Sequence, residues 1–268
     1  MEPRLAILAG HGQLPREIAA ADDTALFVTF DGVDVEVPEG QLHLQASFEK
    51  LGALFKGLRE HSVNEVVFAG SMSRPKLNPL RFDMKTARLM PRVMKAMGGG
   101  DDGLLRVIIE IFEGEGFIVS GAHEVAPALK VHAHTLYGRQ PTKQEKVDAI
   151  RAADILIALS PMDVGQSCVV AGGQCLGIET IQGTDALLRY VATTPEHLKR
   201  GEKGVLVKAA KEGQDLRVDM PTIGPDTIRG VAEAGLAGLF IAAGGVIVLE
   251  QEEVERLVRA HDLFLMAR

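Results

Sequence analysis

The residues best suited to phosphoryl-transfer chemistry lie close together in the C-terminal third of the chain. The carboxylates Asp215, Asp219 and Asp226 stand near the cations Lys208 and Arg217. Carboxylates can hold Mg²⁺, and lysine and arginine can neutralise phosphate oxygens, so this set suits metal-assisted chemistry at a phosphate. On a strand, the alternating residues Asp215, Arg217 and Asp219 would share one face. Solvated surface charge is the alternative, but a proline and a glycine interrupt the run and favour a shaped site.

A glycine-rich turn with the letters GHGQLP follows the first apolar run, at residues 10–15. The backbone N–H groups of such a turn, here at Gly10 and Gly12, can hold a phosphate. Asp31 stands about 20 residues further on, where a dinucleotide-binding domain places its ribose-binding acid. Pro15 occupies the position of the third glycine, which favours a nucleotide phosphate or uridine over a redox dinucleotide. A tight turn that merely requires glycine is the alternative.

Other candidate ligand residues stand where loops follow strands or where helices begin. In an open α/β sheet, ligands bind beyond the carboxyl ends of the strands, where Ser73, Arg74 and His123 are expected. The start of a helix suits a phosphate, and Thr184 with Asp185 opens a predicted helix. An ordinary loop or a helix-capping role is the alternative for each of them.

Short apolar runs alternate with helical patterns in the first half of the chain. They predict strands at 5–8, 26–30, 66–69 and 117–119, with helices around 48–58 and 104–112. Strands that alternate with helices favour a mostly parallel sheet. The first half is therefore predicted to be a Rossmann-like α/β domain.

A polar stretch then interrupts the pattern and predicts a domain boundary. We expect an N-terminal domain at 1–130, a linker at 131–146 and a C-terminal α/β catalytic domain at 147–268. The second domain is predicted to be mixed, and its expected elements follow in order: a helix at 144–159, a hairpin turned at 171–173, a helix at 185–192, a strand at 205–209, a helix that ends at 234, two glycine-bounded strands within 235–249, a helix at 252–261 and a strand at 263–266.

Charge and composition narrow the class of partner. The 36 acidic residues outnumber the 29 basic ones, and a net charge of -7 disfavours sequence-independent binding to nucleic acid. No signal peptide is evident, and the longest apolar run, 235–249, is shorter than the about 20 residues that a membrane span needs. We therefore expect a cytoplasmic protein whose two cysteines, Cys168 and Cys175, are thiols.

Six motifs in this order resemble a known family over essentially the whole chain. They are AGHGQLP at 9–15, FAGSMSRP at 68–75, GDDGLL at 100–105, GAHE at 121–124, GTDA at 183–186 and RVDMPTIGPDT at 217–227. The chain resembles the two-domain UDP-2,3-diacylglucosamine pyrophosphatases of lipid A biosynthesis, which are unrelated to the metallophosphoesterase-fold enzymes that perform the same step.

The resemblance implies a reaction, a cofactor and a place for the site. The diphosphate of UDP-2,3-diacylglucosamine would be hydrolysed to UMP and 2,3-diacylglucosamine 1-phosphate (lipid X), with water directed at the β-phosphorus. A divalent metal, Mg²⁺ or Mn²⁺, is expected, and the site is expected in the cleft between the two domains. Apolar residues that include Met162, Val164 and Leu187 would receive the acyl chains. No basic amphipathic helix is obvious, so we expect only peripheral contact with the cytoplasmic face of the inner membrane.

The resemblance also indicates which residues would act. Asp226, in the motif IGPDT, would be the essential carboxylate that binds the metal or positions water, with Asp219 as its partner in catalysis and metal binding. The other candidates are expected to bind substrate: Gly10, Gly12, Ser73, Arg74, Asp102, His123, Gln166, Thr184, Asp185, Lys208, Arg217 and Thr222.

Two other classes of function remain open from the sequence. A nicotinamide-dependent oxidoreductase would use the first glycine turn and Asp31, and a lack of tight dinucleotide binding would exclude it. A non-catalytic carrier of nucleotide sugar or lipid would bind the same ligand without forming product. The expected oligomeric state is a homodimer.

Overall fold

The structure, a computed structural model, describes residues 4–72, 75–98 and 101–268. The chain divides into two compact units, and neither is one continuous stretch. Unit 1 comprises residues up to Pro127 together with Asp215–Asp219, and unit 2 comprises Ala128–Gln214 and Met220–Arg268. Each unit is an α/β structure with its own sheet and core, as the sequence predicts.

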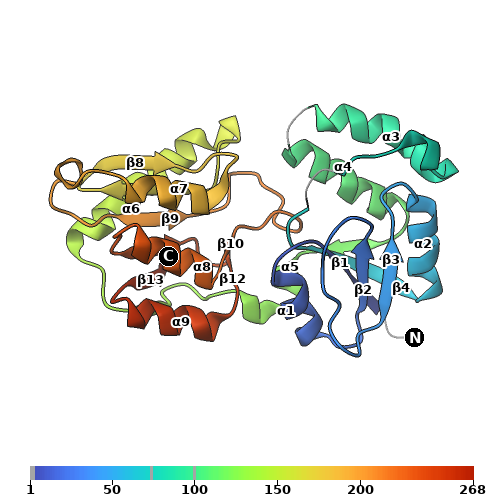
Figure 1. Cartoon of the computed structure of the whole chain (residues 1–268), viewed down its shortest axis with the longest axis horizontal. Coiled ribbons are helices and arrows are strands. Elements are labelled where there is room, and N and C mark those ends of the chain that lie inside the picture. Colours follow the sequence, from blue (N-terminus) through green and yellow to red (C-terminus); the bar gives the residue numbers. More distant parts are fainter. Residues whose placement is uncertain (1–3, 73–74, 99–100) are drawn as a thin grey trace. The chain divides into compact units, whose positions relative to one another are not determined.

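Unit 1 is built on a five-stranded sheet in the order β3-β2-β1-β4-β5, with the strands paired in parallel (Figure 1). The strands are β1 (Arg4–Ala9), β2 (Leu26–Phe30), β3 (His43–Ala46), β4 (Val63–Ala69) and β5 (Ile118–Ser120). The helices are α1 (Leu14–Ala21), α2 (Leu51–Glu60), α3 (Met84–Met97), α4 (Asp101–Gly114) and α5 (Ala122–Val125), with 3₁₀ turns at Pro79–Arg81 and Pro127–Leu129.

Helices cover both faces of this sheet, which explains the continuous apolar runs of its central strands. On one face, Phe55 of α2 and Phe112 of α4 pack edge to face, with their ring centroids 5.2 Å apart. On the other face, α1 contacts β1 through the fully buried Ile18. The sheet order reverses at β1, since β1 lies between β2 and β4. In such a sheet, the loops after the two strands at the reversal form the usual ligand site.

Unit 2 is built on a six-stranded mixed sheet in the order β6-β13-β11-β9-β7-β8. Its strands are β6 (Leu136–Gly138), β7 (Ser167–Ala171), β8 (Gln174–Ile178), β9 (Val205–Lys208), β11 (Gly238–Ile241) and β13 (Phe264–Ala267). β9, β11 and β13 are parallel, and the β13–β6, β9–β7 and β7–β8 pairs are antiparallel. A separate parallel pair joins β10 (Thr222–Ile223) to β12 (Ile247–Val248).

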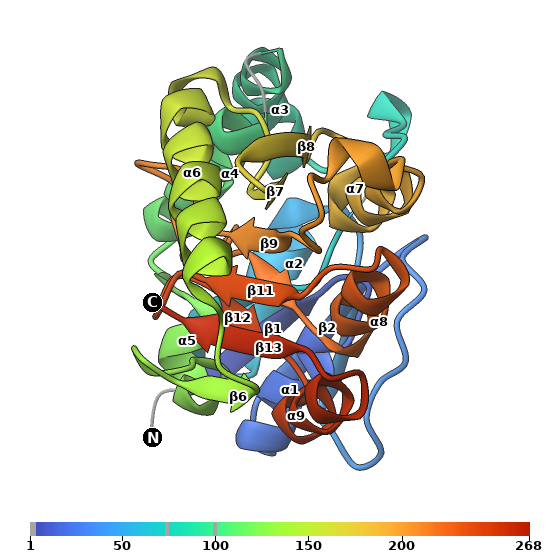
Figure 2. The same cartoon turned by 90° about the vertical axis from the view of Figure 1, so that its left-hand side faces the viewer.

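Figure 2 shows α6 (Lys143–Leu159) on one face of the six-stranded sheet and three helices on the other. These are α7 (Gly183–Ala192), α8 (Pro225–Glu233) and α9 (Gln251–Ala260), and 3₁₀ turns occur at Ser160–Met162 and Glu196–Leu198. The strands alternate accordingly: Cys168 and Val170 pack in the α6 layer, whereas Val169 packs in the layer of the other three helices. Cys168 and Cys175 are free thiols with their sulfur atoms 3.8 Å apart.

The predicted fold class is confirmed, and two local expectations differ from the structure. The sequence patterns did not indicate β3 or α3. Residues 131–146, predicted as a linker, carry β6, an edge strand of the six-stranded sheet, and the first turn of α6. The two buried strands expected within 235–249 are present as β11 and β12, and they belong to different sheets. Across the described residues, no helix combines the length and apolarity that crossing a membrane would require.

Candidate functional site

The loops that follow β1 and β4 bind each other through their backbones. Gly10 N–H donates to the Ala69 carbonyl at 2.7 Å, and His11 and Ser71 exchange N–H···O bonds of 2.8 and 3.0 Å. A Cβ on Gly10 would lie 2.5 Å from the Ser71 carbonyl oxygen. A Cβ on Gly70, whose φ is 86°, would lie 2.5 Å from the His11 carbonyl oxygen. Glycine is therefore required at both positions by the close approach of two loops.

This packing changes the interpretation of the predicted phosphate turn. The N–H groups of Gly10 and His11 already donate to carbonyls, so a phosphate would have to bind further along, towards Gly12 and the start of α1. Gly12, at φ 101°, has open space where a side chain would be. Asp31 accepts a hydrogen bond from the Gln45 amide at 2.9 Å, on the neighbouring strand β3.

Three predicted ligand residues fall where the structure gives no side chain. Ser73 and Arg74 lie outside the described residues, and the side chain of Asp102, in the first turn of α4, does too. Their expected roles in substrate binding stay predictions.

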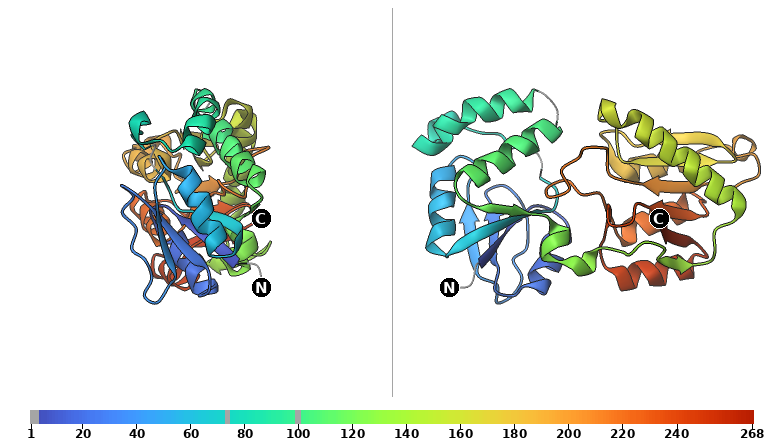
Figure 3. Two further views of the ribbon diagram at one scale, coloured as in Figure 1. Left: turned by 90° about the vertical axis from the view of Figure 1, so that its right-hand side faces the viewer. Right: turned by 180° about the vertical axis from the view of Figure 1, so that it is seen from behind.

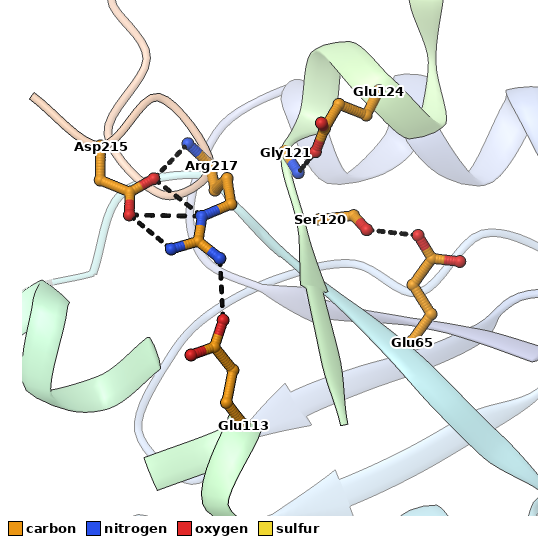
Figure 4. Close-up of polar contacts among 7 residues, drawn as sticks. All are labelled: Glu65, Glu113, Ser120, Gly121, Glu124, Asp215 and Arg217. Atoms are coloured by element: carbon orange, nitrogen blue, oxygen red, sulfur yellow. Dashed lines mark hydrogen bonds and ion pairs between the residues drawn. The ribbon is translucent and has the colours of Figure 1, made fainter. Parts of the chain in front are cut away.

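His123 lies at the carboxyl end of β5, in the short helix α5. Its ring folds back over Gly121, where a Cβ would come within 2.4 Å of the ring carbon Cε1. Gly121 N–H donates to the Glu124 carboxylate at 2.6 Å, and the Ser120 hydroxyl donates to Glu65 (Figure 4). The end of β5 is thus a tightly hydrogen-bonded turn that fixes the position of the imidazole.

Arg217 is held by two carboxylates (Figure 4). Its Nε and Nη2 donate to the two oxygens of Asp215 at 3.0 and 2.7 Å, and its Nη1 donates to Glu113 of α4 at 2.9 Å. The hydrogen bond from Arg217 lowers the pKa of Asp215, and the two carboxylates raise the pKa of Arg217. The carboxylates use three of the five N–H donors of this guanidinium, and the side chain is 36% exposed. The substrate-binding role of Arg217 stays a prediction.

Residues 215–219 form a turn rather than the strand that their alternating charges suggested. The segment belongs to unit 1, where Val218 packs against the core beneath α4 and the Arg217 Cα would lie 3.3 Å from a Cβ on Gly121. Arg217 and Asp219 therefore do not share a strand face. Asp219, half-buried, donates its backbone N–H to the Asp215 carbonyl at 3.3 Å.

In unit 2, a buried lysine and a carboxylate meet at one hydroxyl group. Lys208, the last residue of β9, is 7% exposed and donates from Nζ to the Thr184 hydroxyl at 2.7 Å. That hydroxyl donates to Glu179 at 2.7 Å. Thr184 stands in the first turn of α7, where the helix dipole favours negative charge. The structure thus brings together two residues predicted to orient phosphate, and it adds Glu179 to them.

Gln166 lies at the same sheet edge as Lys208, because β7 runs antiparallel to β9. Its carbonyl accepts from Ala209 N–H at 3.0 Å, and its side-chain amide donates to Gln214 at 3.0 Å. Asp185 is exposed on the first turn of α7. Thr222, in β10, donates its hydroxyl to its own segment, at the Met220 carbonyl, 3.2 Å away.

Asp226 opens α8 with its carboxylate in solvent. Its side chain is 90% exposed and accepts a hydrogen bond from Arg229 at 2.6 Å, one turn along the same helix. Gly224 and Pro225 begin the helix, and Thr227 buries its hydroxyl against the Gly224 N–H at 3.5 Å. The sequence around Asp226 therefore fixes the helix start while it leaves the carboxylate in solvent.

A divalent cation at this site would need oxygen ligands from the substrate as well as from the protein. Among the described residues, no three His, Cys, Asp or Glu side chains gather as a preformed metal cage. Mg²⁺ is commonly bound by one or two carboxylates together with waters and substrate phosphates. An exposed carboxylate at a helix start, such as Asp226, has the right chemistry for that mode.

Two family models match this chain, one in each half. The family model described as the LpxI N-terminal domain matches residues 4–129, and the one described as the LpxI C-terminal domain matches residues 132–266. This chain belongs to the LpxI family. A curated relative, the UDP-2,3-diacylglucosamine pyrophosphatase LpxI of Caulobacter vibrioides, is 36% identical over 280 residues, which cover 98% of this chain and 95% of the relative. The resemblance inferred from the motifs is confirmed.

Two carboxylates of this LpxI-family chain were not among the predicted site residues. Glu113 lies far from Arg217 in sequence, and no local pattern indicates that pairing. Glu179 directly follows the hairpin and precedes Thr184 by five positions. Its place at the end of a strand, next to a predicted helix start, is the signal that could have identified it.

Proposed function

We propose that this chain is a UDP-2,3-diacylglucosamine pyrophosphatase that acts in lipid A biosynthesis. The observation that carries the proposal is the end-to-end likeness to the Caulobacter relative, 36% identical over 98% of this chain. A likeness that spans both family domains supports the whole activity rather than one binding module.

The proposed reaction is hydrolysis at the β-phosphorus. The oxygen of a water molecule forms a bond to that phosphorus, and the bond from the phosphorus to the bridging oxygen breaks. UMP leaves with the bridging oxygen, and 2,3-diacylglucosamine 1-phosphate carries the oxygen that came from water. Charge develops on phosphate oxygens as this happens, so catalysis depends on positioned cations and an oriented water.

We assign Asp226 to the reacting centre. Its exposed carboxylate lies at the start of a nine-residue helix, where it can accept a hydrogen bond from water and hold a cation. Asp219 is the proposed second carboxylate. A divalent cation, Mg²⁺ or Mn²⁺, would neutralise the diphosphate and polarise the water when bound.

The remaining residues are proposed to bind and orient the substrate. Lys208 and Thr184, with Gln166 and Asp185 nearby in unit 2, suit the phosphate and glucosamine groups. A hollow of about 320 Å³ lies between the end of β8 and α7 and is lined by Ile178, Thr180, Gln182, Gly183, Ala186, Leu187 and Tyr190. Its apolar side chains suit an acyl chain. Gly12, Ser73, Arg74 and His123 of unit 1 are proposed for the uridine and sugar.

The test is incubation with UDP-2,3-diacylglucosamine in heavy-oxygen water, with Mg²⁺ or with chelator, and analysis of the products by mass spectrometry. We expect metal-dependent UMP, with the label on the sugar phosphate. Label on UMP would keep the activity but contradict attack at the β-phosphorus. Stoichiometric binding without product would replace the enzyme proposal with a carrier.

A further inference from the structure

Helix α3 of unit 1 presents an apolar stripe to solvent. Figures 1 and 3 show α3 lying outside α4 in this unit, and its packing partners are α4 and α2. Leu89 and Val93 face the core, whereas Met84 and Met94 are 85% and 57% exposed. Leu80, in the turn just before the helix, is 95% exposed. Large apolar side chains exposed along one stripe indicate an interaction surface.

Basic side chains flank that stripe. We define the α3 face as Met84, Ala87, Pro91 and Met94, with Arg88 and Lys95 beside them, all of which are exposed. The four apolar positions recur at helical spacing, so they lie along one side of the helix. No basic amphipathic helix was obvious in the sequence, because Pro91 and the interspersed methionines obscure the helical period of α3.

The charge of this segment is opposite to that of the whole protein. Residues 75–98 contain six basic residues and one acid, in a chain whose net charge is -7. Arg81, Lys85 and Arg92 pair with glutamates of neighbouring elements. Within the described part of the chain, Arg88 and Lys95 have no ion-pair partner. Positive charge that the protein does not itself neutralise therefore lies next to exposed methionines.

A second helix shows that the apolar stripe alone does not decide the partner. Helix α6 of unit 2 also exposes Val147, Ile150 and Ile157. Its three basic residues are matched by three acidic ones within Lys143–Leu159, so its charge is balanced. Of these two helices, α3 is the one that combines the apolar stripe with a net positive charge, and that combination is complementary to an anionic lipid surface.

We propose that the α3 face docks this protein on the surface of an anionic phospholipid bilayer. The methionines and Leu80 enter the headgroup boundary, and Arg88 and Lys95 contact lipid phosphates. Flexible methionine side chains suit an irregular lipid surface. The proposed function supplies only the reason to meet a membrane, since its substrate carries acyl chains. The binding assay contains no substrate, so it can fail or succeed independently of the enzyme activity.

The experiment is co-sedimentation of the full chain with vesicles of phosphatidylcholine alone or of phosphatidylcholine mixed with phosphatidylglycerol. We expect binding to the mixed vesicles only, and release as salt is raised. Arg88→Gln with Lys95→Gln should weaken binding about 30-fold, from the contribution of each basic residue near an anionic surface. Met84→Ser with Met94→Ser should weaken it about tenfold or more. These side chains are exposed, so circular dichroism should show an unchanged fold.

The matched control is Lys143→Gln with Lys146→Gln, which removes the same charge from the exposed, partly apolar helix α6. It should bind like the unchanged protein. Equal loss in this control, equal binding to both vesicle types, or no binding to either would overturn the proposal. Concentration-dependent self-association that Met84→Ser abolishes would also overturn it, since the α3 face would then bind a second copy of the chain.

Discussion

Asp219 and Asp226 stand seven positions apart in the sequence, yet they occupy opposite environments. Asp219 belongs to a turn of unit 1 whose neighbouring arginine is fixed by Asp215 and Glu113, and whose Val218 packs into a core. Asp226 opens a helix of unit 2 with its side chain 90% exposed. The short spacing suggests one charged site in the sequence. In the structure, the two residues belong to different units.

The difference separates residues that hold a position from residues that can react. The Thr184 hydroxyl and the Gly10 N–H are satisfied within the protein, and Arg217 is held by two carboxylates, so changing any of these residues should affect folding stability. The exposed carboxylate of Asp226 is satisfied by one surface arginine, so changing it should affect turnover alone. This distinction can be tested by measuring folding stability and turnover for variants of the packed residues and of Asp226.

The largest expected effect is on turnover, at Asp226. Asp226→Asn should lower kcat by about a thousandfold, because a neutral amide cannot hold a cation or orient water as a carboxylate does. Thermal unfolding should be unchanged. The matched control is Glu252→Gln, which alters an exposed acid in the first turn of α9. Near-normal kcat in Asp226→Asn would contradict the assignment.

The next largest effect is on stability, at Gly10. Gly10→Ala should destabilise unit 1 by about 3 kcal/mol, because its Cβ would lie 2.5 Å from the Ser71 carbonyl oxygen and a paired loop would have to move. Gly12→Ala, with strained backbone but open space, should cost only about 1 kcal/mol. Denaturant titration measures both. A smaller loss in Gly10→Ala than in Gly12→Ala would show that the loop contact is not rigid.

A third measurement concerns the hydroxyl of Thr184. Thr184→Val should destabilise unit 2 by about 2 kcal/mol, because Lys208 and Glu179 would each lose a buried partner. Thr193→Val, which removes an exposed hydroxyl that bonds only the Tyr190 carbonyl, should change stability by less than about 0.5 kcal/mol. Equal denaturation midpoints for the two variants would show that the Thr184 hydroxyl does not stabilise unit 2.

The smallest expected effect is the pH dependence that Asp215 contributes. Its pKa in the folded protein is lowered from 3.8, chiefly by the hydrogen bond from Arg217. The stabilisation is therefore complete above that pH and is lost as the pH falls through the depressed value. Arg217→Gln should reduce the fall in unfolding free energy between neutral and acidic pH.

Other carboxylates with lowered pKa act in the same direction, so the difference between the variant and the unchanged protein is the quantity to measure. Glu110→Gln, on α4 and paired with Arg92, is the control. Parallel pH curves for the Arg217 variant and the unchanged protein would contradict this account.

The elements of the fold were predictable where the apolar period was strong. Strands such as Leu26–Phe30 and the hairpin at Gly172–Gly173 follow from local sequence. The short strand β3 was not predictable, because its exposed His43 and Gln45 leave few apolar residues to mark it. Helix α3 was missed for a related reason, since of its residues only Thr86 is fully buried.

The sequence indicated several residues of the candidate site, but it did not indicate all of the contacts between them. Lys208 and Thr184 were both selected from the sequence, and they meet because β9 ends beside the start of α7. The pairing of Arg217 with Glu113 depends on the chain entering unit 1 a second time, and no local pattern encodes that event. Gly10 was selected as an N–H donor to a phosphate, and in the structure its N–H donates to the Ala69 carbonyl at the end of β4.

The return of the chain to unit 1 at Asp215–Asp219 affects which fragments of the protein can be studied alone. A fragment that stops near Pro127 would lack Asp215–Asp219, and its core would lose the contact with Val218 while Glu113 lost its arginine. The N-terminal half on its own should therefore be less stable than it is within the whole chain. A synthetic peptide that spans 213–221, supplied in trans, should complete it, and the completed fragment would be the smallest version of unit 1 suitable for study on its own.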